Sequence, residues 1–298
     1  MEKLDQLSDL IKFKGKINIV DIGANPLLET KHKNKNVGQP EFQNYYKLLE
    51  KDYVYLTAFE ADENAYNDFL KLNKKNSRCF NYAIGDGSKR KLYITKGSGM
   101  ISTLEPYKKT FDVFNIYKKQ AEVNKTIDVQ TRKLDDIEEI ENIDYLKIDI
   151  QGGELDVFKN GKLKLKKTLF IDTEVSFINL YNNEPTIGEV DIELRKFGLV
   201  PHTFRHISKN IIAPMVINND PFKHLNQIVQ ADIIYVKDFR DLFNLKVDEI
   251  KKICLIAHTC YKSWDLSVRC IKTLIDKKHI SSNAIEEYLK LLSSVTTV

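Results

Sequence analysis

Segments with the pattern of strands alternate with segments that have the pattern of helices, and this order restricts the fold more than any other feature of the chain. Runs rich in apolar and β-branched residues lie at 16–22, 53–61 and 77–86. Apolar residues with helical spacing lie between them, at 40–52 and 63–76. Parallel strands need long crossovers, which are usually helices. The order therefore predicts a parallel sheet with helices on both faces.

The rest of the chain extends this sheet and interrupts it once. The pattern predicts further strands at 143–154, 168–177, 199–207 and 231–238, and further helices at 154–161 and 189–198. Additional strand patterns at 91–97 and 124–134 enclose a loop at 97–106 and a helix near 108–120. We therefore expect an α/β fold with a doubly wound, mostly parallel sheet of about seven strands and an inserted β-hairpin region.

Both ends of the chain are predicted to be helical and to lie outside this sheet. Residues 1–15 form an N-terminal helix, residues 16–240 hold the sheet, and residues 241–298 form a helical C-terminal extension. In the extension, apolar side chains recur with a helical period from Ile250 to Leu274. Such a stripe needs a surface to pack on. We expect the extension to pack on the main domain or on a second subunit, as a homodimer contact.

Charge and composition exclude several classes of partner. The 298 residues carry 46 Lys and Arg against 42 Asp and Glu, for a net charge of +4, and both signs are mixed along the chain. A nucleic-acid surface needs clustered basic residues, so we expect no nucleic-acid partner. No window approaches the roughly 18 apolar residues of a membrane span, and the first residues lack the apolar core of a signal peptide. We therefore expect a cytoplasmic protein.

No metal site or disulfide is predicted. The cysteines lack CxxC spacing, so they are expected to be buried, reduced thiols; they are Cys79, Cys254, Cys260 and Cys270. Asp135, Asp136 and Asp149 offer oxygen ligands that would suit Mg²⁺. The stretch LDDIEEIE at 134–141 is more typical of a helix start, where acids lie near the positive end of the helix.

The loop VDIGANP, at residues 20–26, follows the first predicted strand. In open parallel sheets, ligands bind beyond the carboxyl ends of the strands, where the strand order reverses. Gly23 would let the backbone approach a ligand, and Asp21 could accept hydrogen bonds from a cationic ammonium or fix the loop. Dinucleotide-binding loops use three glycines to admit a pyrophosphate, whereas this loop has one. The acid and the single glycine favour a positively charged ligand such as S-adenosylmethionine.

Two further predicted strands also end in acids. Glu60 follows the second strand, where an acid would accept hydrogen bonds from two ribose hydroxyls. Ile84 and Asp86 end the third strand, where they would pack on an adenine ring and reach its amino group. Acids at three successive strand ends together predict an adenosyl site.

Six motifs in order resemble the FkbM family of S-adenosylmethionine-dependent methyltransferases: VDIGAN, FEAD, AIGDG, GMISTLEP, TRKLDDI and YLKIDIQGGELDVFKNG. The resemblance spans roughly residues 17–238, and LKIDIQGGE is its most specific segment. TEVSFINLY and PHTFRHI resemble a subgroup whose first loop reads DIGANP. The resemblance implies a class I methyltransferase fold, with seven strands of which the last is antiparallel. It also implies methyl transfer to hydroxyls of sugars, glycans or polyketide-like metabolites.

The resemblance implies a set of cofactor contacts along the carboxyl edge of the sheet. The loop 97–106 would fold over the cofactor, although a plain surface hairpin is the alternative. Residues of the first loop would line the methionine end of the cofactor, and Asp149 would face the reactive methyl group. The full expected set is Asp21, Gly23, Ala24, Asn25, Glu60, Ala61, Ile84, Asp86, Met100, Ser102, Asp149 and Gln151.

Methyl transfer to an alcohol also needs a base, because a neutral hydroxyl is a poor nucleophile. Strand alternation puts Lys147 and Asp149 on one face, and Asp149 is the first candidate for the base. Its alternative interpretations are a structural partner of Lys147 and a cofactor ligand. Glu174 and His202 are the other candidates for the base. The expected acceptor is a small molecule or a glycan.

Two other functions fit parts of the sequence. A NAD-dependent oxidoreductase would use the same kind of fold, but the chain lacks the second and third glycines of a dinucleotide loop. A noncatalytic binding module on this fold would have a disabled cofactor loop, whereas Asp21, Gly23 and Glu60 are all present. A methyltransferase therefore stays the first prediction.

Overall fold

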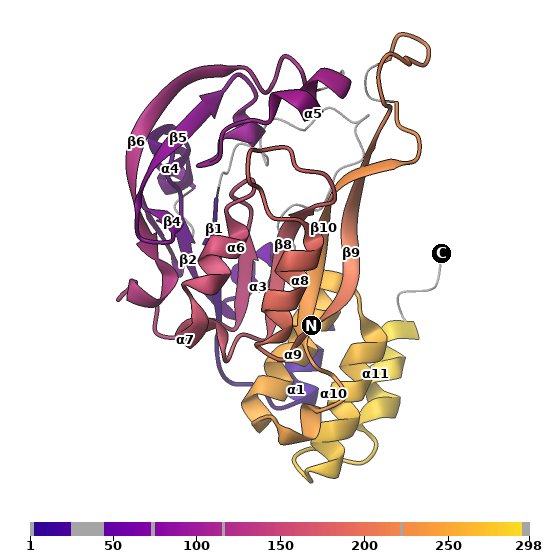
Figure 1. Cartoon of the computed structure of the whole chain (residues 1–298). Helices are drawn as coiled ribbons and strands as arrows, with labels where there is room; N and C mark the ends of the chain where they lie inside the picture. The colour runs from indigo at the N-terminus through magenta and orange to yellow at the C-terminus, as the bar shows by residue number, and fades with distance from the viewer. Residues whose placement is uncertain (1–2, 25–44, 73–74, 115–116, 221–222, 294–298) are drawn as a thin grey trace.

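A computed structural model gives the fold, in which helices lie on both sides of a large sheet and a smaller sheet stands at one edge (Figure 1). The structure describes residues 3–24, 45–72, 75–114, 117–220 and 223–293. The predicted cofactor contact Asn25 and the start of the helix predicted at 40–52 lie outside the described residues.

The main sheet has seven strands. The chain adds strands first on one side of β1 and then on the other, so the strand order reverses between β1 and β7, and we call this place the switch point. In spatial order they are β3 (Ser77–Phe80), β2 (Val54–Phe59), β1 (Ile17–Ile22), β7 (Tyr145–Ile148), β8 (Phe170–Ser176), β10 (Gln227–Lys237) and β9 (Leu199–Asn210). Neighbours from β3 to β8 are parallel. Strand β10 is antiparallel to both β8 and β9. The expected mostly parallel sheet of seven strands with an antiparallel last strand is confirmed.

Each face of this sheet is covered by its own group of helices. The hydrophobic layer on one face includes residues of α1 (Lys3–Leu10), α3 (Tyr46–Glu50), α4 (Glu63–Lys71), α9 (Val247–Tyr261), α10 (Trp264–Asp276) and α11 (Ala284–Ser293), of which α11 packs on α1 and α10. The other face packs against α6 (Glu154–Lys159), α7 (Lys162–Leu165) and α8 (Ile187–Arg195). Because side chains alternate along a strand, Ile19 lies in the first layer and Val20 in the second. Burial on both faces explains why β1 is an almost continuous apolar run.

The predicted third strand, at 77–86, is wrong as a single element, because the structure divides it between two sheets. Strand β3 ends at Phe80, and β4 (Ala83–Gly85) belongs to a three-stranded sheet with β6 (Val123–Lys133) and β5 (Lys89–Thr95). The rings of Tyr82 and Phe80 stack at the junction, with centroids 5.4 Å apart. Asn81, not Asp86, is therefore the residue that follows the third strand of the main sheet.

The insertion around β5 and β6 also contains a short 3-10 helix, η1 (Ser98–Met100), and α5 (Lys108–Val113), which is shorter than the helix predicted near 108–120. The acidic stretch after β6 begins with another 3-10 turn, η2 (Leu134–Asp136). The carboxylate of Asp135 accepts hydrogen bonds from the backbone N–H groups of Leu163 and Lys164, each at 3.1 Å. Asp135 thus lies in the first turn of its own short 3-10 helix and also caps α7, which is distant in sequence. No group of three or more potential metal ligands occurs among the described residues.

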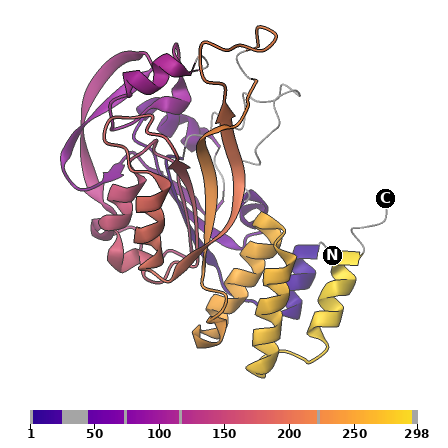
Figure 2. The same cartoon turned by 45° about the vertical axis from the view of Figure 1, so that its right-hand side comes forward.

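The C-terminal extension packs on the sheet of its own chain (Figure 2). It begins with η3 (Leu242–Asn244) and continues through α9 to α11. The hydroxyl groups of Tyr261 in α9 and Tyr145 in β7 are 2.6 Å apart. Lys252 in the same helix forms an ion pair with Asp144 at 3.0 Å. A homodimer contact through these helices stays a prediction. In the part of the chain that the structure covers, no helix is both long enough and apolar enough to span a membrane.

Candidate functional site at the carboxyl edge of the sheet

The parallel strands on both sides of the switch point end side by side, and short or polar residues follow them: Gly23 after β1, Glu60 after β2, Asn81 after β3 and Asp149 after β7. Backbone hydrogen bonds fix these ends relative to one another. The N–H of Gly23 donates to the carbonyl oxygen of Phe59 at 2.9 Å, and the N–H of Asp149 donates to that of Ile22 at 3.0 Å. This edge is where an open α/β sheet binds its ligand, so it is the candidate site.

Gly23 is required by the neighbouring strand. Its φ is +82°, and a Cβ atom built on it would lie 2.0 Å from the carbonyl oxygen of Asp149. A residue with a side chain would therefore be strained and would push β7 away. The next residue, Ala24, is buried, and its N–H donates to Phe59 at 3.2 Å. The sequence suggested a glycine that makes room for a ligand, whereas the structure shows a glycine that makes room for the end of β7.

Replacing Gly23 by Ala is expected to lower the free energy of unfolding by about 2–3 kcal/mol, because the new methyl group meets a backbone oxygen and the left-handed conformation adds strain. Urea denaturation followed by circular dichroism measures this change. Gly188→Ala is the matched control, since its Cβ would meet nothing within 4 Å and it lies in α8. That variant should be neutral or more stable by up to about 1 kcal/mol. A Gly23→Ala protein as stable as wild type would contradict this account.

Asp21 is fully buried beneath this edge and already has partners. Its Oδ2 accepts a hydrogen bond from the hydroxyl of Tyr45, and its Oδ1 lies 3.4 Å from Nζ of Lys147. The cationic ammonium that the sequence suggested as a ligand group is therefore supplied by the chain itself. Although burial lowers the pKa of Lys147, the acids Asp21, Asp149 and Asp172 raise it above its ordinary value.

Glu60, at the end of β2, is buried, with 9% of its surface exposed. Its Oε1 accepts a hydrogen bond from the backbone N–H of Asp62 at 2.8 Å. No side chain of the described residues donates to this carboxyl group. Burial raises the pKa of Glu60 to about 7, although the backbone N–H groups of Asp62 and Ala61 help to lower it. The amide of Asn81 donates to the carbonyl oxygens of Glu60 at 2.8 Å and of Ala61 at 3.3 Å, which ties the ends of β2 and β3 together.

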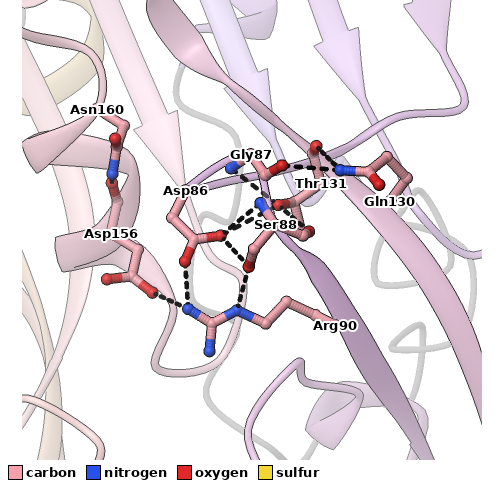
Figure 3. A network of polar contacts seen from close by, with 8 residues as sticks. All are labelled: Asp86, Gly87, Ser88, Arg90, Gln130, Thr131, Asp156 and Asn160. Carbon is pink, nitrogen blue, oxygen red and sulfur yellow. Dashed lines mark hydrogen bonds and ion pairs between the residues drawn. The ribbon is translucent and has the colours of Figure 1, made fainter.

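Ile84 and Asp86, predicted to hold an adenine ring, belong to the smaller sheet. Ile84 is buried in the core layer that includes α6 and α7. Figure 3 shows the carboxylate of Asp86 at the centre of a polar network. It accepts hydrogen bonds from Ser88 and Thr131 and pairs with Arg90, whose guanidinium also reaches Asp156 at 3.3 Å. The hydrogen bond from Arg90 contributes most to holding the pKa of Asp86 well below its usual range.

The network of Asp86 is internal to the β4–β6 junction, because its partners come from β5, β6 and α6. It therefore accounts for Asp86 without a ligand. By its place in the sheet, Asn81 takes the position that the sequence assigned to Asp86. The strand prediction passed over Asn81 because no glycine or proline separates it from the residues of β4.

Asp149 and Glu174 are joined by one amide. Nε2 of Gln151 donates to Oδ1 of Asp149 at 2.7 Å and to Oε2 of Glu174 at 3.0 Å, and its Oε1 accepts from the hydroxyl of Tyr181 at 3.1 Å. No donor in the described ranges reaches Oδ2 of Asp149. Burial, followed by the charge of Asp149, raises the pKa of Glu174 well above its ordinary value. The neutral form of Glu174 is therefore favoured more than that of an exposed glutamate.

The loop that carries Gln151 is held from two sides. Gln151 has a φ of +58°, an uncommon conformation for a residue with a side chain. The hydroxyl of Ser102 donates to its carbonyl oxygen at 2.6 Å. The buried carboxyl of Glu154 accepts from the N–H groups of Ile150 and Gly152, each at 2.9 Å. Of the contacts predicted in the loop 97–106, Ser102 thus fixes Gln151, and Met100 is buried, its carbonyl oxygen accepting a bond from Tyr181.

Acidic side chains outnumber basic ones in the sheet next to Asp149, Gln151 and Glu174. Lys147 lies between Asp21 of β1 and Asp172 of β8 in the register of the sheet. Arg205 of β9 pairs with Asp172 at 3.3 Å and with Asp232 at 3.4 Å. Asp149 and Glu174 lie one step further along the same face, at the strand ends. A buried excess of acids favours binding of a cation at this edge.

His202 is the base candidate that the structure places elsewhere. It lies near the start of β9, where Pro201 pairs with Tyr235 and therefore lies level with the first residues of β8. Its Nε2 is 2.6 Å from the hydroxyl of Ser263, at the start of α10. Burial lowers its pKa. The prediction of His202 as the base is wrong in its placement, because the start of β9 is at the opposite edge of the sheet from Asp149.

Several participants in this edge were not predicted from sequence. Tyr45 and Tyr181 contact Asp21 and Gln151 across 24 and 30 residues of chain, and no local pattern announces such contacts. Tyr181 is the last residue of TEVSFINLY, one of the motifs quoted above. The sequence therefore drew attention to this segment but did not indicate that Tyr181 contacts Gln151.

Comparison with known proteins identifies one family. The family model described as the methyltransferase FkbM domain matches residues 21–200. The 2-O-methyltransferase NoeI of Sinorhizobium fredii is 37% identical over 89 residues, which are 29% of this chain and 37% of that protein, so the match spans little more than a third of its length. The subgroup with a DIGANP loop stays a prediction.

Solved structures resemble the chain only distantly. A putative methyltransferase from Thermoplasma acidophilum is 11% identical with a TM-score of 0.36, over 75% of this chain and 69% of that one. A SAM-dependent methyltransferase from Aquifex aeolicus is 8% identical with a TM-score of 0.30, over 78% of this chain and 89% of that one. At these TM-scores the two structures add nothing to the assignment.

Proposed function

Because the chain belongs to the FkbM methyltransferase family, we propose that it transfers a methyl group to a hydroxyl oxygen of a sugar, a glycan or a secondary metabolite. S-adenosylmethionine is the methyl donor of this methyltransferase family and is the cofactor of this chain. The name of the NoeI relative includes 2-O-methyltransferase, which supports oxygen as the methylated atom. The observation that carries the proposal is the pairing of Asp149 with Glu174 through Gln151 at the carboxyl edge.

The residues at this edge fit the cofactor in charge and in hydrogen-bonding capacity. Glu60 has a buried carboxyl group to which no side chain of the described residues donates, which suits a ribose hydroxyl. Asn81, at the end of the third strand, would be adjacent to the adenine. The excess of acids around Asp149 suits the positive charge of a sulfonium. When bound, the cofactor supplies a methyl carbon that is open to in-line attack.

Asp149 is the base in this proposal. Its Oδ1 is held by Gln151, and none of the described residues donates to its Oδ2. Asp149 could therefore take the hydroxyl proton as the acceptor oxygen bonded to the methyl carbon and the methyl–sulfur bond broke, with S-adenosylhomocysteine as the leaving group. Glu174 is less suited to be the base, because both of the causes that raise its pKa, burial and the charge of Asp149, oppose its ionised form. It instead accepts a hydrogen bond from Gln151 and so helps to keep that side chain in place.

The binding of S-adenosylhomocysteine, the demethylated cofactor, is expected to be about tenfold weaker at pH 6 than at pH 8. Ribose hydroxyls donate to the ionised form of Glu60, and that form is lost as the pH falls through the pKa of about 7. Isothermal titration calorimetry over this pH range measures the effect. In Glu60→Gln the affinity should be low at both pH values and nearly independent of pH. If the variant keeps the pH dependence of wild type, another group controls binding.

A thermal-shift comparison of S-adenosylhomocysteine with NAD tests the cofactor class, because a ligand at 100 times its dissociation constant stabilises a protein by about 2.7 kcal/mol. Transfer of tritium from labelled S-adenosylmethionine to hydroxylated acceptors then tests the reaction. Stabilisation by NAD, without stabilisation by S-adenosylhomocysteine, would contradict the proposal.

A further inference from the structure

Two buried amide nitrogens at the carboxyl edge, Nδ2 of Asn210 and Nε2 of Gln230, have no hydrogen-bond partner in the described part of the chain. We infer that these amides bind hydroxyl groups of the methyl acceptor, and that the acceptor is a neutral polyhydroxylated compound rather than a phosphorylated or acidic one. The inference rests on the proposed function, because it assigns the acceptor half of the same site.

Both amides lie on the face of the sheet that carries the catalytic acids. Gln230 of β10 is opposite Ser208 of β9, and Asp232, two residues along on the same face, is opposite Glu174 of β8. Asn210 ends β9 two residues beyond Ser208, which places it on the same face and about 6.5 Å further along. The pair β9–β10 reaches beyond β8 at this edge (Figure 2). The amides therefore continue the polar row that begins at Glu174.

The burial of these amides makes their lack of partners costly. Asn210 is 6% exposed and Gln230 is 8% exposed. An amide that is removed from water without a partner costs about 1–3 kcal/mol, and folded proteins pair nearly all such groups. A bound molecule that supplies acceptor oxygens removes this cost. The position of the amides, on a row that leads to the base, indicates that the molecule is the acceptor.

The chemistry around the amides selects hydroxyl groups. A side-chain amide donates and accepts hydrogen bonds, as a hydroxyl does, so amides suit sugars. The charged neighbours are acidic: burial raises the pKa of Asp232 to about 6, so it is ionised near neutral pH. The charge of Arg205 is balanced by two acids, because its Nη2 lies 3.3 Å from Asp172 and 3.4 Å from Asp232. An anionic acceptor would face these acids and would be repelled.

The test compares variants that remove each amide and keep its approximate size, Asn210→Leu and Gln230→Leu. The protein loaded with S-adenosylhomocysteine is titrated with methyl glucoside, methyl galactoside and methyl mannoside, and with the matching sugar 1-phosphates, by saturation-transfer NMR. Wild type should bind at least one neutral glycoside and no sugar phosphate. Each variant should weaken glycoside binding about tenfold, which corresponds to one lost hydrogen bond. The affinity for S-adenosylhomocysteine should stay unchanged.

Gln227→Leu is the matched control, because Gln227 lies opposite Asn210 but its amide donates to the carbonyl oxygen of Ile228 at 2.8 Å. It should leave glycoside binding unchanged. Equal glycoside binding by wild type and both amide variants would overturn the inference. So would preference for the sugar phosphates, or absence of glycoside binding by loaded wild type. Failure of wild type to bind S-adenosylhomocysteine would instead contradict the proposed function, which separates the two results.

Discussion

Replacing Asp149 by Asn is expected to lower kcat for methyl transfer about a thousandfold, within the range that a general base contributes. The asparagine still accepts the hydrogen bond from Gln151 that Asp149 accepts at 2.7 Å, so the loop keeps its position. It does not take up a proton from the acceptor hydroxyl. Single-turnover transfer of tritium from S-adenosylmethionine measures the rate, and calorimetry should find S-adenosylhomocysteine bound as tightly as by wild type.

Glu174→Gln is the comparison that distinguishes the two carboxyl groups. Because burial raises the pKa of Glu174 and favours its neutral form, an amide of the same shape is expected to lower kcat less than about tenfold. The hydrogen bond from Gln151 to the Glu174 carboxyl is retained by the new carbonyl oxygen. If Glu174→Gln loses as much activity as Asp149→Asn, or if Asp149→Asn keeps more than a tenth of wild-type kcat, the assignment of the base is wrong.

The order of strands and helices could be predicted from sequence because burial leaves a periodic pattern. β1 is buried on both faces and is largely apolar, and the helix stripe from Ile250 to Leu274 corresponds to α9 and α10. The boundary between β3 and β4 was missed for the same reason. Residues 79–84 stay largely apolar or aromatic across it, and only the pairing of strands separates the two sheets.

The chemistry of the site was only partly predictable. The sequence indicates which residues lie at strand ends, but it does not indicate which residues they pair with. Glu60 and Asp149 were predicted at the edge and are found there. Asp21 was predicted as a ligand contact, and the sequence did not indicate its ion pair with Lys147, which is 126 residues away. Asp86 was predicted beside an adenine, and the sequence did not indicate that it pairs with Arg90. Long-range pairing of this kind leaves no local signal.

Replacing Lys147 by Met is expected to lower the free energy of unfolding by about 3–5 kcal/mol, because it leaves buried carboxylates without their cation. The side chain of Lys147 is 8% exposed and that of Asp21 is fully buried. In the sheet, Asp172 flanks Lys147 on its other side. The folded pKa of Lys147 is raised above its ordinary value, so its contribution is complete below pH 10.5 and is lost only as the pH rises through the folded pKa.

The double variant Asp21→Asn with Lys147→Met separates the ion pair from simple packing. If the unpaired acid causes the loss, the double variant should recover about half of it, since the introduced amide can still accept from Tyr45 while the buried charge is gone. Urea midpoints measured from pH 6 to pH 9 should show the same loss for Lys147→Met throughout, because the pKa of Lys147 lies above this range. A loss equal to the sum of the two single variants would mean that Asp21 and Lys147 do not interact.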